Sequence, residues 1–377
     1  MEATPAAAAA AAPLLSLPPE LLALVVSKVQ SRKNSLRSTS RVLRMAVDAS
    51  TSAVTWTRPE RLRVYLSRQL ALSCPGIHRL DCSGHEEDTY MPEVCLEAVP
   101  PSIRTLICSH TRMVSLGSLS ACMLLQTLDC GNTEVSELGP LAACSSLQVL
   151  SCSCTSVAEL GPLAACTLLQ DLNCSSTRVT TLGPLTACAS LQTLDCSFNQ
   201  LLDDLGPLSS CTLLQKLHCS HSRLADVGPL AACLQLQTLG VDLTLVTDLG
   251  PLAACTLLQA LHCRGTRLAE IGPLAACMSL RTLDCSHTQV AQLGPLSACT
   301  LLQTLNCSHT QVAQLGPLSA CMLLQTLNCS HAQVAQLGPL SACTGLVHVT
   351  CDMRVSLEHA QELHAYCHGL KEVCRGG

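Results

Sequence analysis

Apolar residues return at a fixed interval along most of the chain. In the 22 residues LQTLNCSHTQVAQLGPLSACML, which begin at Leu302, they occupy positions 1, 4, 6, 11, 14, 17 and 20. The units that begin at Leu280 and Leu324 each differ from this one at three positions. Neither the helical period of about 3.6 residues nor the strand period of about 2 fits the whole unit. Self-similarity over so short a period indicates an architecture of stacked repeats.

Each unit predicts one short strand and one tight turn. Alternation of apolar and polar residues holds only around Leu305 and Cys307, so the strand is expected there. Gly316 and Pro317 follow: Gly permits unusual backbone dihedral angles, and Pro fits the first position of a helical turn. The segment that ends at Cys321 has room for a single 3₁₀-like turn. One unit cannot close a core alone, but stacked units bury a continuous apolar column.

The strand triplet Leu-x-Cys, or a close variant of it, occurs thirteen times, so we expect thirteen strands. The spacing is 22 residues except for 26 after Leu80 and 23 after Leu194. The first residue of each triplet, position 4 of the unit, is Leu80, Leu106, Leu128, Leu150, Leu172, Leu194, Leu217, Leu239, Leu261, Leu283, Leu305, Leu327 or Val349. At about 4.8 Å per strand the sheet would span roughly 60 Å, which suits a protein or peptide ligand.

This spacing resembles that of the leucine-rich-repeat family over residues 77–351. The resemblance implies an α/β repeat solenoid, a horseshoe or arc with short strands on its concave face and turns and 3₁₀ pieces on its convex face. The chain departs from the family pattern in two ways. Cys replaces Leu at positions 6 and 20, and Thr replaces the usual Asn at position 9, as at Thr310. A Thr hydroxyl can bond turn backbone as an Asn side chain does, though more weakly.

The cysteines follow the repeat. Of 28, twelve occupy position 6 and eleven occupy position 20. These positions face the core, and a free Cys behaves there as a small apolar residue. We therefore expect reduced core thiols, with disulfides or metal along the ladder as the alternative. Reduced thiols are typical of a cytoplasmic or nuclear protein.

The two ends of the chain depart from the repeat. Residues 1–13 are an Ala-rich tail expected to be disordered, residues 14–56 are expected to form helices, and residues 57–76 a linking helix. The second helix of residues 14–56 is expected to run from Leu36 to Ala46, with Trp56 closing the segment. Residues 84–101 are an insertion in the first repeat. In residues 352–377 a capping helix is expected from Ser356 to Cys367, followed by a frayed tail that contains Cys374.

Residues 14–56 resemble an F-box. The resemblance is carried by Leu17-Pro18, Glu20-Leu21-Leu22 with Val25, Leu36 and Ser40-Arg41 with Arg44, and Val47-Asp48 followed by Trp56. It implies docking on the small adaptor protein of the cullin ubiquitin-ligase scaffold. The adaptor-binding residues would be Leu17, Pro18, Glu20, Leu21, Leu22, Val25, Leu36 and Trp56. A plain helical cap on the first repeat is the alternative.

Charge divides the chain in a similar way. The formal net charge is −5, but residues 1–75 hold ten Lys or Arg against four Asp or Glu, and the remainder holds twelve against twenty-three. A basic head on an acidic solenoid indicates two parts with different partners. Nucleic acid is not expected, because Phe198 is the one aromatic residue between Leu106 and Val349, and bases would have little to stack on.

No membrane partner is expected either. The most apolar early stretch, residues 6–26, is interrupted by Pro13, Pro18, Pro19 and Glu20. No Lys or Arg precedes the Ala run, so a signal peptide is not expected.

The concave face is the candidate site for a protein target. Strand side chains alternate, so positions 3 and 5 should point out of the core. Irregular units are the best candidates for specific contacts, since identical units cannot define a register. The candidate target-binding residues are Lys216, His218, Asp242, His262, Arg264, Asp284, His287, Asn306, His309, Asn328 and His331.

Two groups of residues could in principle bind metal. His287, His309 and His331 should form a column, and imidazole is a common metal ligand. We expect the alternative, in which each His is a surface residue that was copied together with its repeat and binds no metal. His85, Glu86, Glu87 and Asp88 lie together in the insertion and are expected to form a solvated loop. No metal or other cofactor is expected.

No catalytic constellation emerges, so we expect a protein that is not an enzyme. The leading hypothesis is a substrate-recruiting, F-box-type subunit of a cullin-RING (SCF-type) ubiquitin ligase, monomeric outside that complex. The second is a non-enzymatic leucine-rich-repeat scaffold or phosphatase-regulator-like interaction protein, in which the N-terminal helices only cap the solenoid. A third is metal or redox buffering by the thiols.

Overall fold

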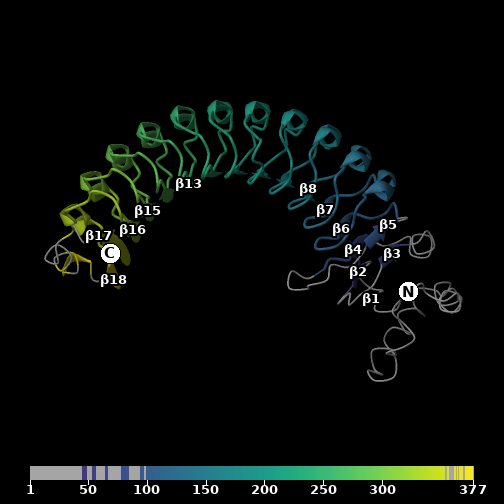
Figure 1. Ribbon diagram of the computed structural model, residues 1–377, viewed down its shortest axis with the longest axis horizontal. Helices are drawn as coiled ribbons and strands as arrows, with labels where there is room; N and C mark the ends of the chain where they lie inside the picture. The colour runs from purple at the N-terminus through teal and green to yellow at the C-terminus, as the bar shows by residue number, and fades with distance from the viewer. Residues whose placement is uncertain are drawn as a thin grey trace, which may run out of the picture. The chain divides into compact units, whose positions relative to one another are not determined.

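The structure is a computed structural model in which the chain forms two compact units, residues 1–178 and 179–377. It describes in full residues 78–84, 99–352, 355, 361, 363, 365–367, 370 and 371. For residues 45–48, 53–56, 64–66, 94–96 and 372–376 it describes the backbone. In each unit the strands line the concave side and the 3₁₀ helices line the convex side (Figure 1).

Each regular repeat is a three-residue strand followed by a five-residue 3₁₀ helix. In the repeat that begins at Leu302, β15 spans Thr304–Asn306 and η10 spans Gly316–Ala320. Pro317 lies in the first turn of η10, where its fixed φ suits the helix and its missing N–H is not needed. The helix closes when the Cys321 N–H donates to the Leu318 carbonyl at 2.9 Å.

The repeats of the first unit stack in parallel. Leucines of adjacent strands pair directly, as Leu106 does with Leu128. The repeat strands are β4 Arg79–Asp81, β6 Thr105–Ile107, β7 Thr127–Asp129, β8 Val149–Ser151 and β9 Asp171–Asn173. The 3₁₀ helices are η1 Gly117–Ala121, η2 Gly139–Ala143 and η3 Gly161–Ala165.

The second unit continues the same pattern. Its strands pair in parallel without a register slip, so Leu305 faces Leu327 and Thr304 faces Thr326. The strands are β10 Thr193–Asp195, β11 Lys216–His218, β12 Thr238–Gly240, β13 Ala260–His262, β14 Thr282–Asp284, β15, β16 Thr326–Asn328 and β17 His348–Asp352. The 3₁₀ helices are η4 Gly183–Ala187, η5 Gly206–Ser210, η6 Gly228–Ala232, η7 Gly250–Ala254, η8 Gly272–Ala276, η9 Gly294–Ala298, η10 and η11 Gly338–Ala342. All thirteen predicted strand positions are confirmed.

The core is a column of leucine and cysteine. Leu305, Cys307 and Cys321 are all 0% exposed, and the same positions are buried in the other described repeats. The prediction that positions 6 and 20 face inward is therefore confirmed. A leucine in each strand and a thiol at each end of the repeat fill the space between adjacent turns, which is why the apolar period is fixed.

Polar side chains inside the turns satisfy the backbone that the strand leaves unpaired. The Thr310 hydroxyl donates to the Cys307 carbonyl at 2.6 Å, as expected for a Thr at position 9. Asn199, which keeps the family residue there, donates to the Cys196 carbonyl at 2.9 Å. Its Oδ1 atom also accepts from the Val179 N–H of the preceding repeat at 3.2 Å. The larger Asn amide thus joins two repeats.

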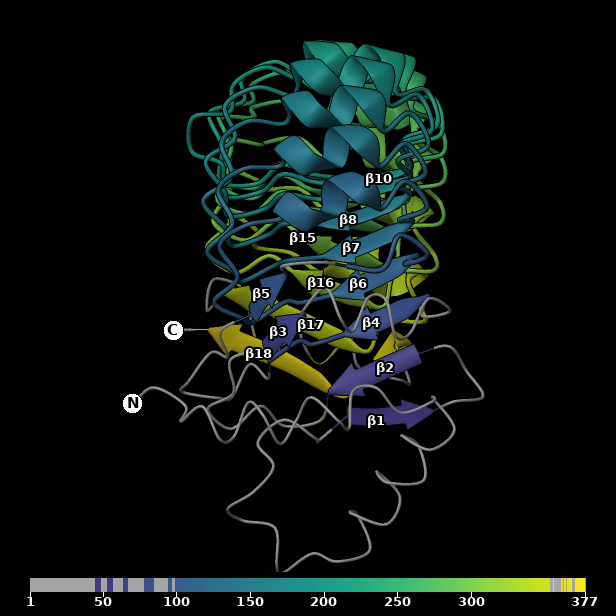
Figure 2. The ribbon, with the colours of Figure 1, turned by 90° about the vertical axis from the view of Figure 1, so that its right-hand side faces the viewer.

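The N-terminal end of the sheet is a hairpin, which corrects one prediction. β1 Met45–Asp48 pairs antiparallel with β2 Ala53–Trp56, and β2 pairs in parallel with β4 (Figure 2). The predicted helix is therefore wrong at Met45 and Ala46, and Trp56 lies in a strand. The reason is tertiary: the edge of β4 offers unpaired backbone groups, and the β-branched residues of this segment suit a strand.

A second short sheet corrects the adjoining predictions. β3 Val64–Leu66 pairs in parallel with β5 Val94–Leu96. The linking helix predicted for residues 57–76 is therefore wrong at residues 64–66, and the insertion contains a strand. The cluster His85 to Asp88 lies outside the described residues.

The C-terminal end closes with a helical stretch and a final strand. Gln361, Leu363, Ala365 and Tyr366 are helical, in agreement with the predicted capping helix, and Leu363 is 2% exposed. β18 Glu372–Gly376 then pairs in parallel with β17. The prediction of a frayed tail at Cys374 is wrong, because the edge of β17 recruits this segment as another strand.

Candidate functional site

The strands present rows of half-exposed polar side chains. In the three-residue repeat strands the central residue is buried and its neighbours are partly or fully exposed, as Thr304, Leu305 and Asn306 show, except at Gly240 of β12, which is buried. Because the strands pair in register, Asp284, Asn306 and Asn328 form one row across β14, β15 and β16. The predicted outward direction of positions 3 and 5 is confirmed.

One oxygen of each residue in this row is already engaged. Asp284 accepts from the backbone N–H and the hydroxyl of Ser286, the latter at 2.6 Å. Asn306 and Asn328 accept from Ser308 and Ser330 in the same way. Part of each residue therefore holds its own turn, and the Asn306 amide also donates to the second carboxylate oxygen of Asp284 at 3.2 Å.

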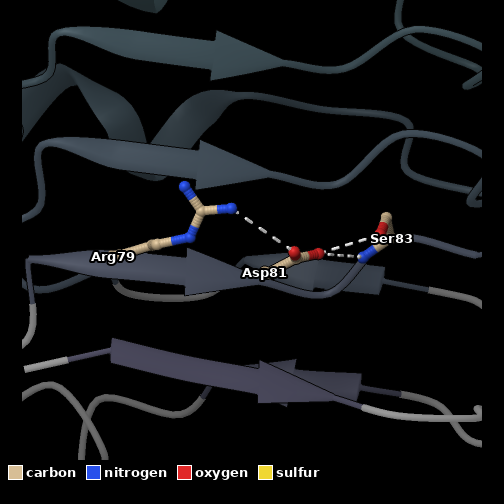
Figure 3. Close-up of polar contacts among 3 residues, drawn as sticks. All are labelled: Arg79, Asp81 and Ser83. Atoms are coloured by element: carbon tan, nitrogen blue, oxygen red, sulfur yellow. Dashed lines mark hydrogen bonds and ion pairs between the residues drawn. The ribbon is translucent and has the colours of Figure 1, made fainter. Parts of the chain in front are cut away.

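The first repeat of the solenoid shows the same turn. Asp81 accepts from the N–H and the hydroxyl of Ser83 at 3.2 and 2.8 Å (Figure 3). Its second carboxylate oxygen lies 3.8 Å from the Arg79 guanidinium. The turn is thus a structural device of the repeat rather than a feature of one site.

The irregular repeats bring several predicted target-binding residues together. Lys216 and His218 lie on β11 and His262 on β13, two strands away in the same register. In the turns that follow β13 and β12, the Arg264 N–H donates to the Asp242 carboxylate at 2.7 Å. The sequence-based grouping of these five residues is reproduced in space.

Gly240 interrupts the row of position-5 side chains. A Cβ atom there would stand 2.9 Å from Nδ1 of His218, so the imidazole of His218 leans over the space that other repeats fill. The Asp242 carboxyl lies close by. Burial raises its pKa above the usual value, and the Arg264 N–H and His262 oppose that shift.

The predicted histidine column exists and is tightly stacked. The ring centroids of His287 and His309 are 4.1 Å apart, and those of His309 and His331 are 4.2 Å apart. Desolvation and the two neighbouring imidazoles lower the pKa of His309. Stacked rings present their faces to one another, so their nitrogens do not converge on a common point. Among the described residues no group of three or more His, Cys, Asp or Glu is placed to hold a metal ion.

The described core thiols are buried and form no disulfide. Burial raises the pKa of Cys321 to about 11 and that of Cys343 to about 12. Most position-20 thiols also donate to carbonyls of preceding repeats, as Cys343 does to Leu318 at 3.3 Å. Among the cysteines whose side chains the structure describes, all are free and Cys154 is the exposed one. The sequence did not reveal this hydrogen-bonding role.

The repeated Asp, Ser and His side chains do not form a nucleophile. In the repeat that contains β14, the Ser286 hydroxyl donates to Asp284 and is 1% exposed. A serine nucleophile needs its proton to pass to a base and its oxygen to reach substrate. This hydroxyl instead holds a turn, so the combination is structural.

The left-handed backbone of position 8 is a feature that the sequence pattern did not reveal. The position-8 residues have positive φ in the eleven repeats from that of His110, at 56°, to that of His331, at 55°, and Gly265 among them has a φ of 65°. The column includes Phe198 and Leu243, which are 52% and 49% exposed. Asn132 and Gly265 at this position were the available signal, because both residue types tolerate the left-handed region.

The predicted adaptor-binding residues are mostly beyond what the structure describes. Trp56 lies in β2. The others, Leu17, Pro18, Glu20, Leu21, Leu22, Val25 and Leu36, lie outside the described residues. Across the part of the chain that is described, no helix is long and apolar enough to cross a membrane.

Comparison with known proteins bears on the fold. The family model for leucine-rich repeats, two copies, matches residues 167–210 and 279–320. The fold is a leucine-rich-repeat solenoid. An internalin, InlF, from Listeria monocytogenes has a similar structure, with a TM-score of 0.74 and 20% identity over 87% of this chain and 92% of that one.

Two further structures resemble this chain. A leucine-rich-repeat protein from Leptospira interrogans has a TM-score of 0.68 and 15% identity, covering 81% of this chain and 86% of that one. A chain of the LRIM1/APL1C complex has a TM-score of 0.65 and 18% identity, covering 87% and 62%. At these identities the likeness shows the fold alone. No protein of curated function matches the sequence.

Proposed function

We propose that this leucine-rich-repeat protein is a non-enzymatic receptor that binds a protein or peptide target across its strand face. The observation that carries the proposal is the in-register array of half-exposed polar side chains over a rigid leucine and cysteine core. A rigid, preformed surface binds an extended partner without a large ordering cost. A neighbour of the same fold belongs to a complex of two proteins, which supports the same class of function.

The second unit is the favoured target-binding region. It contains all the irregular strand-face residues named above, from Lys216 to Arg264, and the histidine column. The repeats that carry β15 and β16 present Thr and Asn in identical positions. They would enlarge the contact area but could not fix where along the sheet the target binds. Specificity would therefore reside in the repeats of β11, β12 and β13.

The finer function is recruitment of that target to a cullin-RING ubiquitin ligase. This role rests on the resemblance of residues 14–56 to an F-box. The second helix of that F-box would have to end before β1. The hairpin of β1 and β2 extends the repeat sheet, which favours a capping role for residues 45–56. We assign adaptor binding to the part of this segment that precedes Met45, which includes Leu21 and Leu22. The free thiols of the described core suit the cytoplasm or nucleus as the compartment.

The experiment for the ligase role is an adaptor pull-down with the full chain. Wild-type protein should retain the purified adaptor, and the Leu21→Asp variant should lose it while its thermal unfolding stays unchanged. A deletion of residues 14–56 is a poor test, since it would also remove the strands that pair with β4. Equal retention, or no retention by either protein, would leave the scaffold or phosphatase-regulator-like role as the better assignment.

The experiment for target binding is cross-linking in cell extract. A photoreactive residue in place of Thr238 on β12 should capture a partner, and the same residue in place of Ser297 on η9 should not. Capture by the convex-side variant alone would contradict binding on the strand face.

A further inference from the structure

In the second unit the two flanks of the solenoid differ in charge. One flank leads from each convex-side 3₁₀ helix back to the next strand, and we call it the return flank (Figure 2). It comprises residues 188–192, 211–215, 233–237, 255–259, 277–281, 299–303, 321–325 and 343–347, and Arg281 is its one charged residue. The opposite flank, which leads from each strand to the next helix within residues 196–337, holds nine charged residues.

The return flank also exposes large apolar side chains in successive repeats. Of the six repeats that contain η5 to η10, five present a Leu or Met there that is 41–65% exposed, and Leu301 of the sixth is half-buried. The exposed side chains are Leu213, Leu234, Leu257, Met278, Met322 and Leu323. Exposed apolar side chains gathered on a surface with little charge are typical of the centre of a protein interface.

Other exposed apolar side chains of the second unit lie in a different setting. Phe198, Leu201, Leu243 and Leu245 belong to the opposite flank and lie among its charged residues. The return flank is therefore the side of this unit on which exposed Leu and Met coincide with a near absence of charge.

The polar groups at the inner margin of the return flank are amides. Six of its eight segments end in a glutamine that is exposed or half-buried, namely Gln192, Gln215, Gln237, Gln259, Gln303 and Gln325. A primary amide both donates and accepts hydrogen bonds, so the same surface on a second molecule can satisfy it. A surface of one charge would instead repel its own copy.

The size of the return flank matches what a stable interface needs. Three residues of each segment are exposed or half-buried, which gives 24 residues over the eight repeats. A stable interface uses roughly 20–30 residues on each side.

The backbone of the return flank is already hydrogen-bonded, so a partner meets side chains on a preformed surface. The Gln303 N–H donates to the Arg281 carbonyl, and the Gln325 N–H donates to the Gln303 carbonyl, both at 2.8 Å. The Leu302 N–H donates to the Cys299 carbonyl at 3.0 Å. A surface fixed in this way loses little conformational entropy when it binds.

We propose that the return flank of the second unit binds the return flank of a second copy of this chain, around a twofold axis. The spacing of the repeats is the same in both copies, so successive Leu, Met and Gln side chains of one copy meet those of the other. The strand face stays open, so this dimer is separate from target binding. It replaces the monomer expected from the sequence.

A lipid surface is a poorer partner for the return flank. Proteins that bind anionic membranes through their surface carry clusters of Lys and Arg, whereas Arg281 is the single cation here.

Sedimentation equilibrium of the full chain tests the proposal, in a buffer with a reducing agent so that no disulfide joins two copies. At about 50 µM, above the micromolar end of the affinities of such interfaces, wild type should have twice the chain mass of 39.7 kDa. M278E/M322E should raise the dissociation constant of the dimer at least about tenfold, because each copy brings both charges into an apolar contact. A monomeric wild type, or an unchanged dissociation constant in M278E/M322E, would overturn the proposal.

The matched control is L201E/L245E, which makes the same kind of change at two exposed leucines of the opposite flank. Its dissociation constant should stay within about threefold of wild type. A loss of dimer as large as in M278E/M322E would overturn the proposal, because the contact would then not be specific to the return flank. Thermal unfolding of each variant checks that these exposed substitutions leave the fold intact.

Cross-linking of the purified protein locates the contact. A photoreactive residue in place of Leu257 should join two copies, and mass spectrometry should find the bond within the return flank of the partner. Bonds to the strand face or to the opposite flank would overturn the pairing of like flanks. A wild type that stays monomeric and sediments with phosphatidylcholine vesicles would show that the return flank binds lipid, and the proposal would be wrong.

Discussion

The imidazole rings of His287 and His309 stack with their centroids 4.1 Å apart and their planes inclined by 14°. His331 continues the stack beyond His309, at 4.2 Å. His309 is therefore flanked on both sides by rings that oppose its protonation. The pKa of His309 is lowered first by partial desolvation and then by His287 and His331, while Asp352 acts in the opposite direction.

This stack predicts loss of stability in mild acid. A group whose pKa is lower in the folded chain binds its proton more weakly there than in the unfolded chain. The contribution of His309 is complete above the usual His pKa of about 6.5 and is lost as the pH falls through its lowered folded value. Urea unfolding followed by circular dichroism should show a smaller decrease between neutral pH and about pH 5 for H309Q than for wild type.

The control for this prediction is H348Q. His348 begins β17, outside the stacked column. Its replacement should leave the acid sensitivity of the protein as it is in wild type. Identical pH dependence for H309Q and wild type would contradict the assignment of that sensitivity to the stack.

Gly265 predicts a local requirement for glycine. Its φ is +65°, and a Cβ atom would stand 2.5 Å from the Cδ2 atom of Leu243. G265A should lower the free energy of unfolding by about 1–2 kcal/mol, since both the left-handed backbone and the contact oppose it. G265A/L243A should recover part of that loss. G294A is the control, because a Cβ there meets nothing within 4 Å and φ is not positive.

The thiols predict a sharp contrast in reactivity. Cys154 is exposed at position 8, whereas Cys307 is 0% exposed and burial raises its pKa well above the usual value. At pH 8 the native protein should react with a thiol reagent at Cys154, and C154S should lose one rapid equivalent. C307S should leave that rapid phase unchanged. Retention of the full rapid phase by C154S would show that Cys154 is shielded.

Most of the repeat architecture follows from the sequence because its causes are local. The apolar positions, the Gly-Pro pair and the fixed spacing place β15 and η10 within a residue or two. Stacking then needs no further information, since each unit meets a copy of itself. The same logic placed the strand-face residues Asp284 and Asn306 and the inward thiols.

The ends of the solenoid could not be read in the same way. Met45 and Ala46 fit a helical apolar pattern, but the open edge of β4 recruits this region as a hairpin. Cys374 joins a strand for the same reason at β17. The left-handed backbone at Leu243 was not predicted either. Gly and Asn commonly adopt this conformation, but most position-8 residues are His, Cys or Leu, which give no such signal. The pairing of a sheet edge and the backbone dihedral angles both depend on residues that are distant in the sequence, so a local pattern cannot predict them.

Position 9 predicts a stability difference between two neighbouring repeats. The Thr310 hydroxyl donates to the Cys307 carbonyl at 2.6 Å, whereas Ala332, the same position of the next repeat, has no hydroxyl for the Cys329 carbonyl. T310A should lower the free energy of unfolding by about 1 kcal/mol. A332T should raise it by up to about 1 kcal/mol, because Thr occupies this turn in most other repeats.

Urea denaturation of the full chain measures both changes, with A335T as the control. Ala335 lies in the same repeat as Ala332 but is exposed, so the added hydroxyl should change stability by less than about 0.5 kcal/mol. Thr310 and Ala332 occupy adjacent turns, so T310A/A332T can depart from the sum of the single changes. A loss of stability in A332T as large as in T310A would mean that the turn around Ala332 has no room for the hydroxyl.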